Sequence, residues 1–177
     1  MNAPRLPLSM IPCSAKANVR TILSAEAWQA LAKEVKARAG HRCEACFTKD
    51  LPLESHEFFS FSGGVQRLDR IAALCAADPA SGLLGCHNVT HAGRSLRLGG
   101  GQLAEPIVRR LMEVNEWDSR EATIAYIQAE FALVRARGRQ TWRLDLELLR
   151  EFGIEPPDIF PTRPLGTSRW RRLVGAA

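Results

Sequence analysis

The sequence has no long hydrophobic run, and it contains few lysines, few histidines and a single tyrosine. A membrane-spanning helix needs about 20 consecutive apolar residues, and no stretch approaches that length. The opening MNAPRLPLSMIPCS has early prolines and lacks the apolar centre of a signal peptide, so we expect a cytoplasmic protein without a membrane partner. At 177 residues, with 46% hydrophobic and 24% charged residues, the composition excludes a disordered or collagen-like chain.

Lysine is scarce, because only 4 of the 24 basic residues are lysines and the rest are arginines. The formal net charge is +5. The planar guanidinium fork binds phosphate oxygens in pairs, so this bias favours a polyanionic partner such as nucleic acid. Coding sequence rich in G and C produces the same bias toward arginine, and the net charge alone does not distinguish this origin from a nucleic-acid partner. The sequence leaves the oligomeric state open.

The cysteine number is odd, which excludes a complete set of disulfides among the five. In a reducing compartment, closely spaced cysteines more often bind metal. Cys43 and Cys46 form a C-x2-C pair that suits one tetrahedral zinc ion. Cys75 and Cys86 supply a second pair, which predicts a structural Zn²⁺ site with four sulfur ligands. The alternative is a set of unrelated buried thiols, which is our interpretation of Cys13.

Three of the four histidines, His56, His87 and His91, follow the C-x2-C pair in sequence. His87 and His91 are four residues apart, so on a short helix they point to the same side and can bind one cation. Because they follow Cys86, a structural zinc would anchor the helix that presents a second, open metal site. His56 lies in LPLESHEFFSFSGG, which is typical of a strand that enters a turn. Solvated histidines on the surface are the alternative.

The rest of the chain is expected to be mainly helical. A helix is predicted from the N-cap Ser24 to Gly40, the run IAALC returns toward the cysteines, and another helix follows Pro106. Asp118 and Glu121 form an acidic capping box, which opens a helix running to Gly138. We expect the apolar stripe of that helix to lie in the core; it comprises Ile124, Ile127, Phe131 and Val134.

These expectations divide the chain into four parts. Residues 1–40 are an extended lead-in and a helix, and 41–100 hold the metal-binding motifs. Residues 101–155 form a helical region, and 156–177 are a tail rich in proline and arginine.

The order of motifs resembles the HNH endonuclease family, in particular its bacterial and phage members that carry a zinc ribbon. The segments that carry the resemblance are CEAC, LESHEFF, SGG, IAALC and GCHNVTHAG. The resemblance implies an α+β fold with a central ββα-metal module and a structural zinc knuckle, flanked by an N-terminal helix and a C-terminal helical region. It implies a hydrolase that cleaves phosphodiester bonds, with DNA as the expected nucleic-acid partner and Mg²⁺ or another divalent cation as catalytic cofactor.

Single positions inherit roles through this resemblance. His56 matches the base that deprotonates water, and His87 and His91 match the ligands of the catalytic metal. The match also assigns the structural zinc ligands: Cys43, Cys46, Cys75 and Cys86. Two positions depart from the family pattern. Ser55 stands where many members have a metal-binding Asp or His, and Arg70 replaces the central Asn.

Contacts to nucleic acid are expected from arginines inside and outside this segment. Arg70, in place of the missing Asn, is expected to contact phosphate. The other candidates are Arg94, Arg97, Arg169, Arg171 and Arg172, the last three beside Trp170, whose indole can stack on a base. A solvated basic tail explains the terminal group equally well.

Two other functions remain open. Ser55 and Arg70 favour a catalytically silent, zinc-stabilised module of HNH shape that binds nucleic acid or has a regulatory role. A zinc ribbon that only binds other proteins is the third hypothesis.

Overall fold

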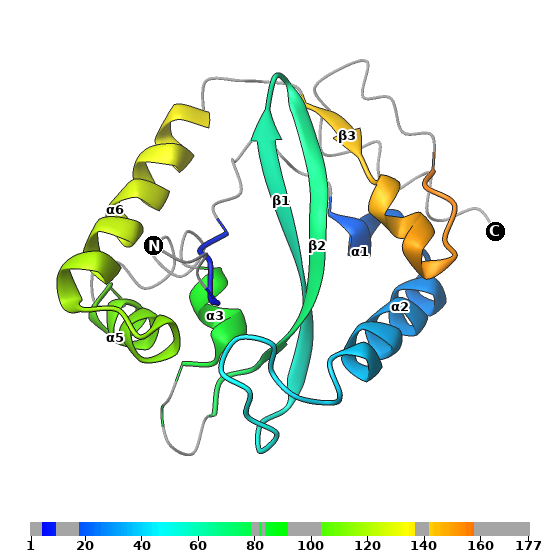
Figure 1. The fold of residues 1–177 in the computed structure, drawn as a ribbon. Helices are drawn as coiled ribbons and strands as arrows, with labels where there is room; N and C mark the ends of the chain where they lie inside the picture. The colour runs from blue at the N-terminus through cyan, green and yellow to red at the C-terminus, as the bar shows by residue number, and fades with distance from the viewer. Residues whose placement is uncertain are drawn as a thin grey trace.

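The fold is α+β, with one three-stranded sheet and helices on both sides of it (Figure 1). The structure is a computed structural model, which describes residues 5–9, 18–78, 82, 84–91, 104–136 and 142–157. The N-terminal half contains α1 (Val19–Ile22), α2 (Ala25–Arg38), β1 (Leu53–Ser62), β2 (Val65–Cys75) and α3 (Cys86–Thr90). The C-terminal half contains α5 (Ala104–Asn115), α6 (Ser119–Ala136), β3 (Arg143–Asp145) and the 3₁₀ helix η2 (Glu147–Phe152). None of the helices in these described ranges has the length and apolar character of a membrane span.

The antiparallel hairpin β1–β2 runs through the middle of the molecule and turns at Gly63 and Gly64 (Figure 1). Both turn residues have positive φ, +57° and +83°, which favours glycine. The register shifts between Phe58 and Phe59, as in a β-bulge. The predicted strand and turn are therefore confirmed.

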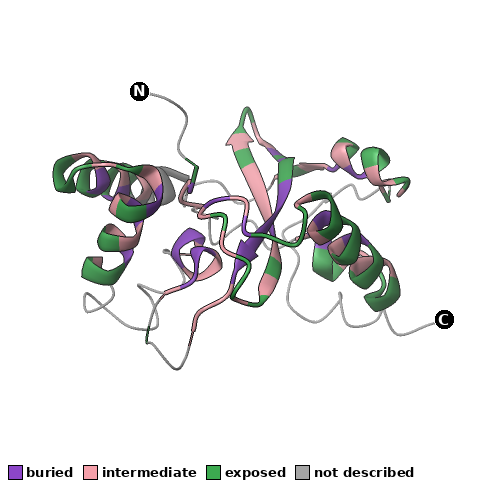
Figure 2. Ribbon diagram, turned by 60° about the horizontal axis from the view of Figure 1, so that its bottom comes forward, coloured by how far each residue is buried: buried purple, intermediate pink, exposed green. Residues whose placement is uncertain are grey.

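Strand β2 is buried on both faces near its end, which explains why IAALC is a continuous apolar run. One face, with Ala72 and Leu74, packs into a core shared with α3, α5 and α6. The opposite face, with Ile71 and Ala73, packs into a second core with α1, α2 and η2. Figure 2 shows the end of β2 and much of α3 buried between helices whose outer faces are exposed.

The predicted helix caps are present. Ser24 Oγ accepts a hydrogen bond from Ala27 N at 3.2 Å, and α2 ends before Gly40. Asp118 Oδ1 accepts from Glu121 N at 2.8 Å, and Glu121 Oε2 accepts from Asp118 N at 3.0 Å, so the capping box of α6 is confirmed.

One prediction for the C-terminal half is wrong, and another, of a helical region, is incomplete. The described part of the α6 stripe is not core, because Ile124, Ile127 and Phe131 are 43%, 42% and 63% exposed. Instead, Ala122 and Tyr126 are buried, since these two residues share the face that packs toward α5. The region is also not wholly helical, because β3 pairs in parallel with the start of β2. Its three residues are too few to show a periodic pattern.

Candidate metal centres

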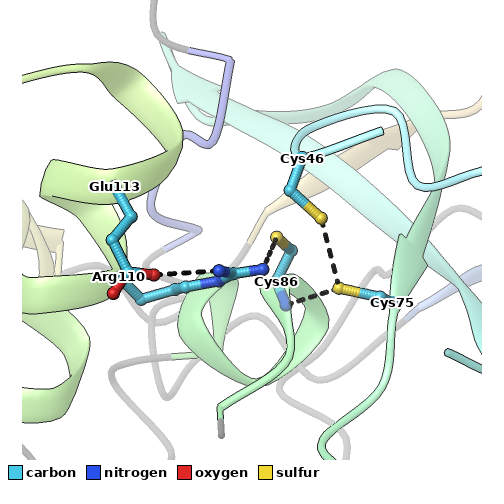
Figure 3. Close-up of polar contacts among 5 residues, drawn as sticks. All are labelled: Cys46, Cys75, Cys86, Arg110 and Glu113. Atoms are coloured by element: carbon cyan, nitrogen blue, oxygen red, sulfur yellow. Dashed lines mark hydrogen bonds and ion pairs between the residues drawn. The ribbon is translucent and has the colours of Figure 1, made fainter. Parts of the chain in front are cut away.

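The structure brings the four predicted cysteines together from three separate segments. Their sulfur atoms lie within 4.8 Å of one another, and Cys46 Sγ is 3.7 Å from Cys75 Sγ (Figure 3). Cys43, Cys75 and Cys86 are buried, and Cys46 is half-buried. A cluster of four thiols with this spacing can hold a metal ion such as zinc.

The C-x2-C segment is a tight turn that hydrogen bonds to β2. Phe47, at φ +63°, donates its N–H to Cys43 O at 2.8 Å and so closes the turn. Glu44 N donates to Ala73 O at 2.9 Å, and Glu44 Oε1 accepts from Ala73 N at 2.8 Å. Because Ala73 is two residues before Cys75, these bonds hold the turn beside the end of β2.

Gly85 allows the fourth cysteine to reach the cluster. It is the N-cap of α3, directly before Cys86. A Cβ on Gly85 would lie 2.2 Å from both the carbonyl carbon and the carbonyl oxygen of Ala76, which no side chain tolerates. This close approach brings Cys86 N within 3.3 Å of Cys75 Sγ.

The thiols influence one another's protonation strongly. Hydrogen bonds from Cys46, Cys75 and Cys86 hold the pKa of Cys43 well below its usual range. Hydrogen bonds with Cys43, Cys46 and Cys75, followed by burial, raise the pKa of Cys86. The pKa values of Cys43 and Cys46 are thus lowered and those of Cys75 and Cys86 raised, so two protons leave the cluster more readily than the other two, because each further thiolate repels those already formed. A bound dication would remove that repulsion.

A second cluster contains the three predicted histidines. His56 comes from β1, and His87 and His91 come from α3 and its C-cap. One nitrogen of each ring lies within 4.8 Å of the other two. The ring centroids are 5.4 Å apart for His56 and His87, 4.4 Å for His56 and His91, and 4.7 Å for His87 and His91.

His56 lies at the buried end of this cluster. It is 1% exposed, and neither ring nitrogen has a hydrogen-bond partner in the structure. Burial, and then the charges of His91 and His87, lower the pKa of His56 to about 3. The ring is therefore neutral near pH 7, which is the form that binds metal. A cation bound to one of these nitrogens would give the buried ring a polar partner that no described residue supplies.

Strand alternation decides which neighbours of His56 join the cluster. Glu54 lies on the same face, and its Oε2 is 2.7 Å from His87 Nδ1. Ser55 and Glu57 point to the opposite face, where Ser55 Oγ donates to Ala32 O at 3.4 Å and Glu57 accepts from Arg20 N at 3.2 Å. Of the two glutamates that flank Ser55 and His56, only Glu54 therefore contacts the histidines.

Arg70 contacts protein groups. Its Nη2 lies 2.6 Å from Glu44 Oε2, and its guanidinium lies 5.9 Å from the centre of the Phe58 ring. Binding of phosphate by Arg70 stays a prediction. The remaining predicted nucleic-acid contacts, and Cys13, lie outside the described residues: Arg94, Arg97, Arg169, Arg171 and Arg172.

Sequence reasoning missed Arg110, a residue of α5 that contacts the sulfur cluster. Its Nη2 lies 3.7 Å from Cys86 Sγ (Figure 3). Burial alone would lower the pKa of this guanidinium, but the pair with Glu113 and the charge on Cys86 and Cys46 raise it above its usual value. The sequence held one signal for Arg110: it lies three residues after the buried Ile107, and residues with this spacing share a helix face.

Comparison with known proteins gives no match: no protein-family model, no curated protein and no solved structure matches this chain. Function is therefore inferred from the residues and distances described above.

Proposed function

We propose that this protein is a metal-dependent nuclease of the HNH type, which hydrolyses phosphodiester bonds with DNA as its expected substrate. The observation that supports this most is the convergence of three imidazoles beside a four-cysteine cluster. The two clusters meet at α3, where Cys86 belongs to one and His87 to the other. The order hairpin, then short helix, also agrees with the order that the family resemblance implies.

The four cysteines are assigned to a structural Zn²⁺ ion. Four thiolates complete a tetrahedral shell and leave no position for substrate. The ion would join three segments of the chain: the turn before β1, the end of β2 and the start of α3. Its binding free energy would thus contribute to folding.

The three histidines are assigned to the catalytic cation. Three nitrogen ligands leave positions open, and such a set suits Zn²⁺, Ni²⁺ or Mn²⁺ better than Mg²⁺, which prefers oxygen. When bound, the cation would polarise the phosphate and lower the pKa of a bound water. Glu54 would hold the His87 ring through Nδ1, so that the opposite nitrogen, Nε2, faces the cation.

His56 is assigned as the third ligand rather than as the separate base that the sequence predicted. A general base must reach a water molecule next to the substrate, directly or through one more water. At 1% exposure, His56 has little access to solvent, whereas its position beside His87 and His91 suits ligation.

A plasmid-cleavage assay with Mg²⁺, Mn²⁺, Ni²⁺ and Zn²⁺ tests the nuclease assignment. We expect the wild type to cleave the plasmid and His87→Ala to cleave it about 100-fold more slowly or worse. Mutation of a residue that hydrogen bonds to a metal ligand typically costs about 10- to 100-fold in activity, and loss of the ligand itself should cost at least as much. His41→Asn is the matched control. His41 lies outside both clusters at φ +52°, a conformation that Asn tolerates. No cleavage with any of the four ions, or equal cleavage by His87→Ala, would refute the assignment.

Metal content separates the two roles of His56. If His56 is a ligand, His56→Ala loses both cleavage and the second metal ion, and keeps the cysteine-bound zinc. If His56 is only a base, the variant keeps both ions and loses about 10² to 10⁴ in rate. Elemental analysis of the purified variants distinguishes these results.

A silent module that binds nucleic acid is the second candidate. Ser55 Oγ donates to Ala32 O on the opposite face of β1, and Arg70 is a cation that pairs with Glu44, so neither side chain supplies an additional metal ligand. This candidate predicts that the protein retards DNA without cutting it. A protein-binding zinc ribbon predicts no retardation.

A further inference from the structure

Arg110 is the cationic side chain that the structure places against the sulfur cluster. It reaches from α5, and its Nη2 lies 3.7 Å from Cys86 Sγ (Figure 3). Its Nη1 pairs with Glu113 Oε2 at 2.9 Å, which fixes the orientation of the guanidinium. The side chain is only 18% exposed, so the contact lies largely out of bulk water.

The neighbouring arginine has no such environment. Arg109 is 68% exposed and pairs with Glu105 one turn earlier on the helix surface. Ile107, Leu111 and Val114 are buried on the core face of α5, and Arg110 lies next to that face. Two adjacent arginines thus provide a natural comparison, in which only one contacts sulfur.

Charge gives this contact its importance. Four thiolates around Zn²⁺ carry a net negative charge, and a buried charge is costly unless an opposite charge or hydrogen bonds compensate it. Arginine suits this position because its guanidinium stays charged when it is partly desolvated. Cys86 has the closest guanidinium contact, so its thiolate gains the most.

We propose that Arg110 is a positioning residue of the four-cysteine zinc site, which offsets negative charge on the thiolates, donates to Cys86 and thereby couples α5 to the metal centre. The proposal rests on the zinc assignment made above and is independent of nuclease activity.

Zinc affinity of the full-length protein tests the proposal. Competition of Zn²⁺ with a chromophoric chelator should show about 10- to 100-fold weaker binding to the cysteine site in Arg110→Gln. Arg109→Gln should bind as the wild type does. Arg110→Lys should lie between them, because it keeps the charge and loses the planar fork. If Arg110→Gln does not fold, the zinc affinity of Arg110→Lys alone decides the test.

Cobalt spectroscopy adds a measurement that a purely structural role would not change. With Co²⁺ at the cysteines, the sulfur-to-metal charge-transfer band should move to longer wavelength in Arg110→Gln, because the Cys86 thiolate loses a donor and a nearby positive charge.

The outcomes separate the two assignments. If the wild type binds no zinc at the cysteines, the zinc assignment fails and the role of Arg110 fails with it. If the wild type binds zinc, and both Arg110 variants match Arg109→Gln in affinity and spectrum, only the role of Arg110 is overturned.

Discussion

At the scale of single residues, the face on which a strand residue lies decides its role. Glu54 and His56 leave β1 on the same face, whereas Ser55 and Glu57 leave it on the other. A carboxylate thus contacts the imidazole of His87. Such a carboxylate orients the ring and raises the basicity of a ligand histidine.

Glu54→Gln should therefore weaken binding of the second metal ion by about 10- to 100-fold. The cysteine site should keep its affinity, because Glu54 contacts His87 rather than sulfur. Titration of zinc-loaded protein with Ni²⁺ measures the effect. Glu57→Gln makes the same chemical change on the opposite face and should leave Ni²⁺ affinity unchanged; equal effects of the two variants would show that Glu54 does not support the site.

Part of the site could be predicted at this scale. The cysteines and histidines stand close together in the chain or follow one another in recognisable order, so their type and spacing were sufficient. The contacts of Arg110 and Glu44 were not predicted, because neither residue belongs to a metal-binding motif. Helix spacing places Arg110 beside the buried face of α5 but does not say what that face packs against. Such contacts depend on how α5 and the cysteine turn pack, which no local pattern encodes.

At the scale of elements, the junction between β2 and α3 depends on a close backbone approach at Gly85. Gly85 approaches Ala76 so closely that a Cβ would overlap its carbonyl group at 2.2 Å. The chain can place Cys86 beside Cys75 only if this approach is kept.

Gly85→Ala should destabilise the protein by at least about 1–3 kcal/mol, because backbone must move to admit the methyl group. It should also weaken zinc binding. Thermal unfolding and zinc competition measure the two effects. Gly82→Asn is the control, since Gly82 has open space around it and a φ of +68° that Asn tolerates. A Gly85→Ala protein with wild-type stability and zinc affinity would contradict this account of the junction.

Elements with a strong local sequence signal were predictable, and features that depend on tertiary packing were not. Helix α2, the hairpin and the capping box of α6 follow from cap residues, alternation and turn glycines. The orientation of α6 could not be predicted, because the helix has two faces with apolar residues and the sequence does not show which one packs into the core. The structure buries the face with Ala122 and Tyr126 and exposes the face with Ile124, Ile127 and Phe131. Strand β3 exists because the edge of β2 is available for pairing.

At the scale of the whole molecule, the sheet separates two cores of different composition. The core on the side of α3, α5 and α6 contains the buried cysteines Cys43, Cys75 and Cys86. The core on the side of α2 and η2 contains none of the described cysteines. Both proposed metal ions would thus lie on one side of β2, and α3 would contribute to both.

The central claim is that one chain binds two metal ions in separate sites that meet at α3. Anomalous diffraction from crystals grown with Zn²⁺, then soaked in Ni²⁺, tests it most directly. We predict one zinc peak within bonding distance of the sulfur atoms of Cys43, Cys46, Cys75 and Cys86, and a second peak bonded to nitrogen atoms of His56, His87 and His91. Crystals that show metal at the cysteines and none among the three histidines after the Ni²⁺ soak would contradict the account.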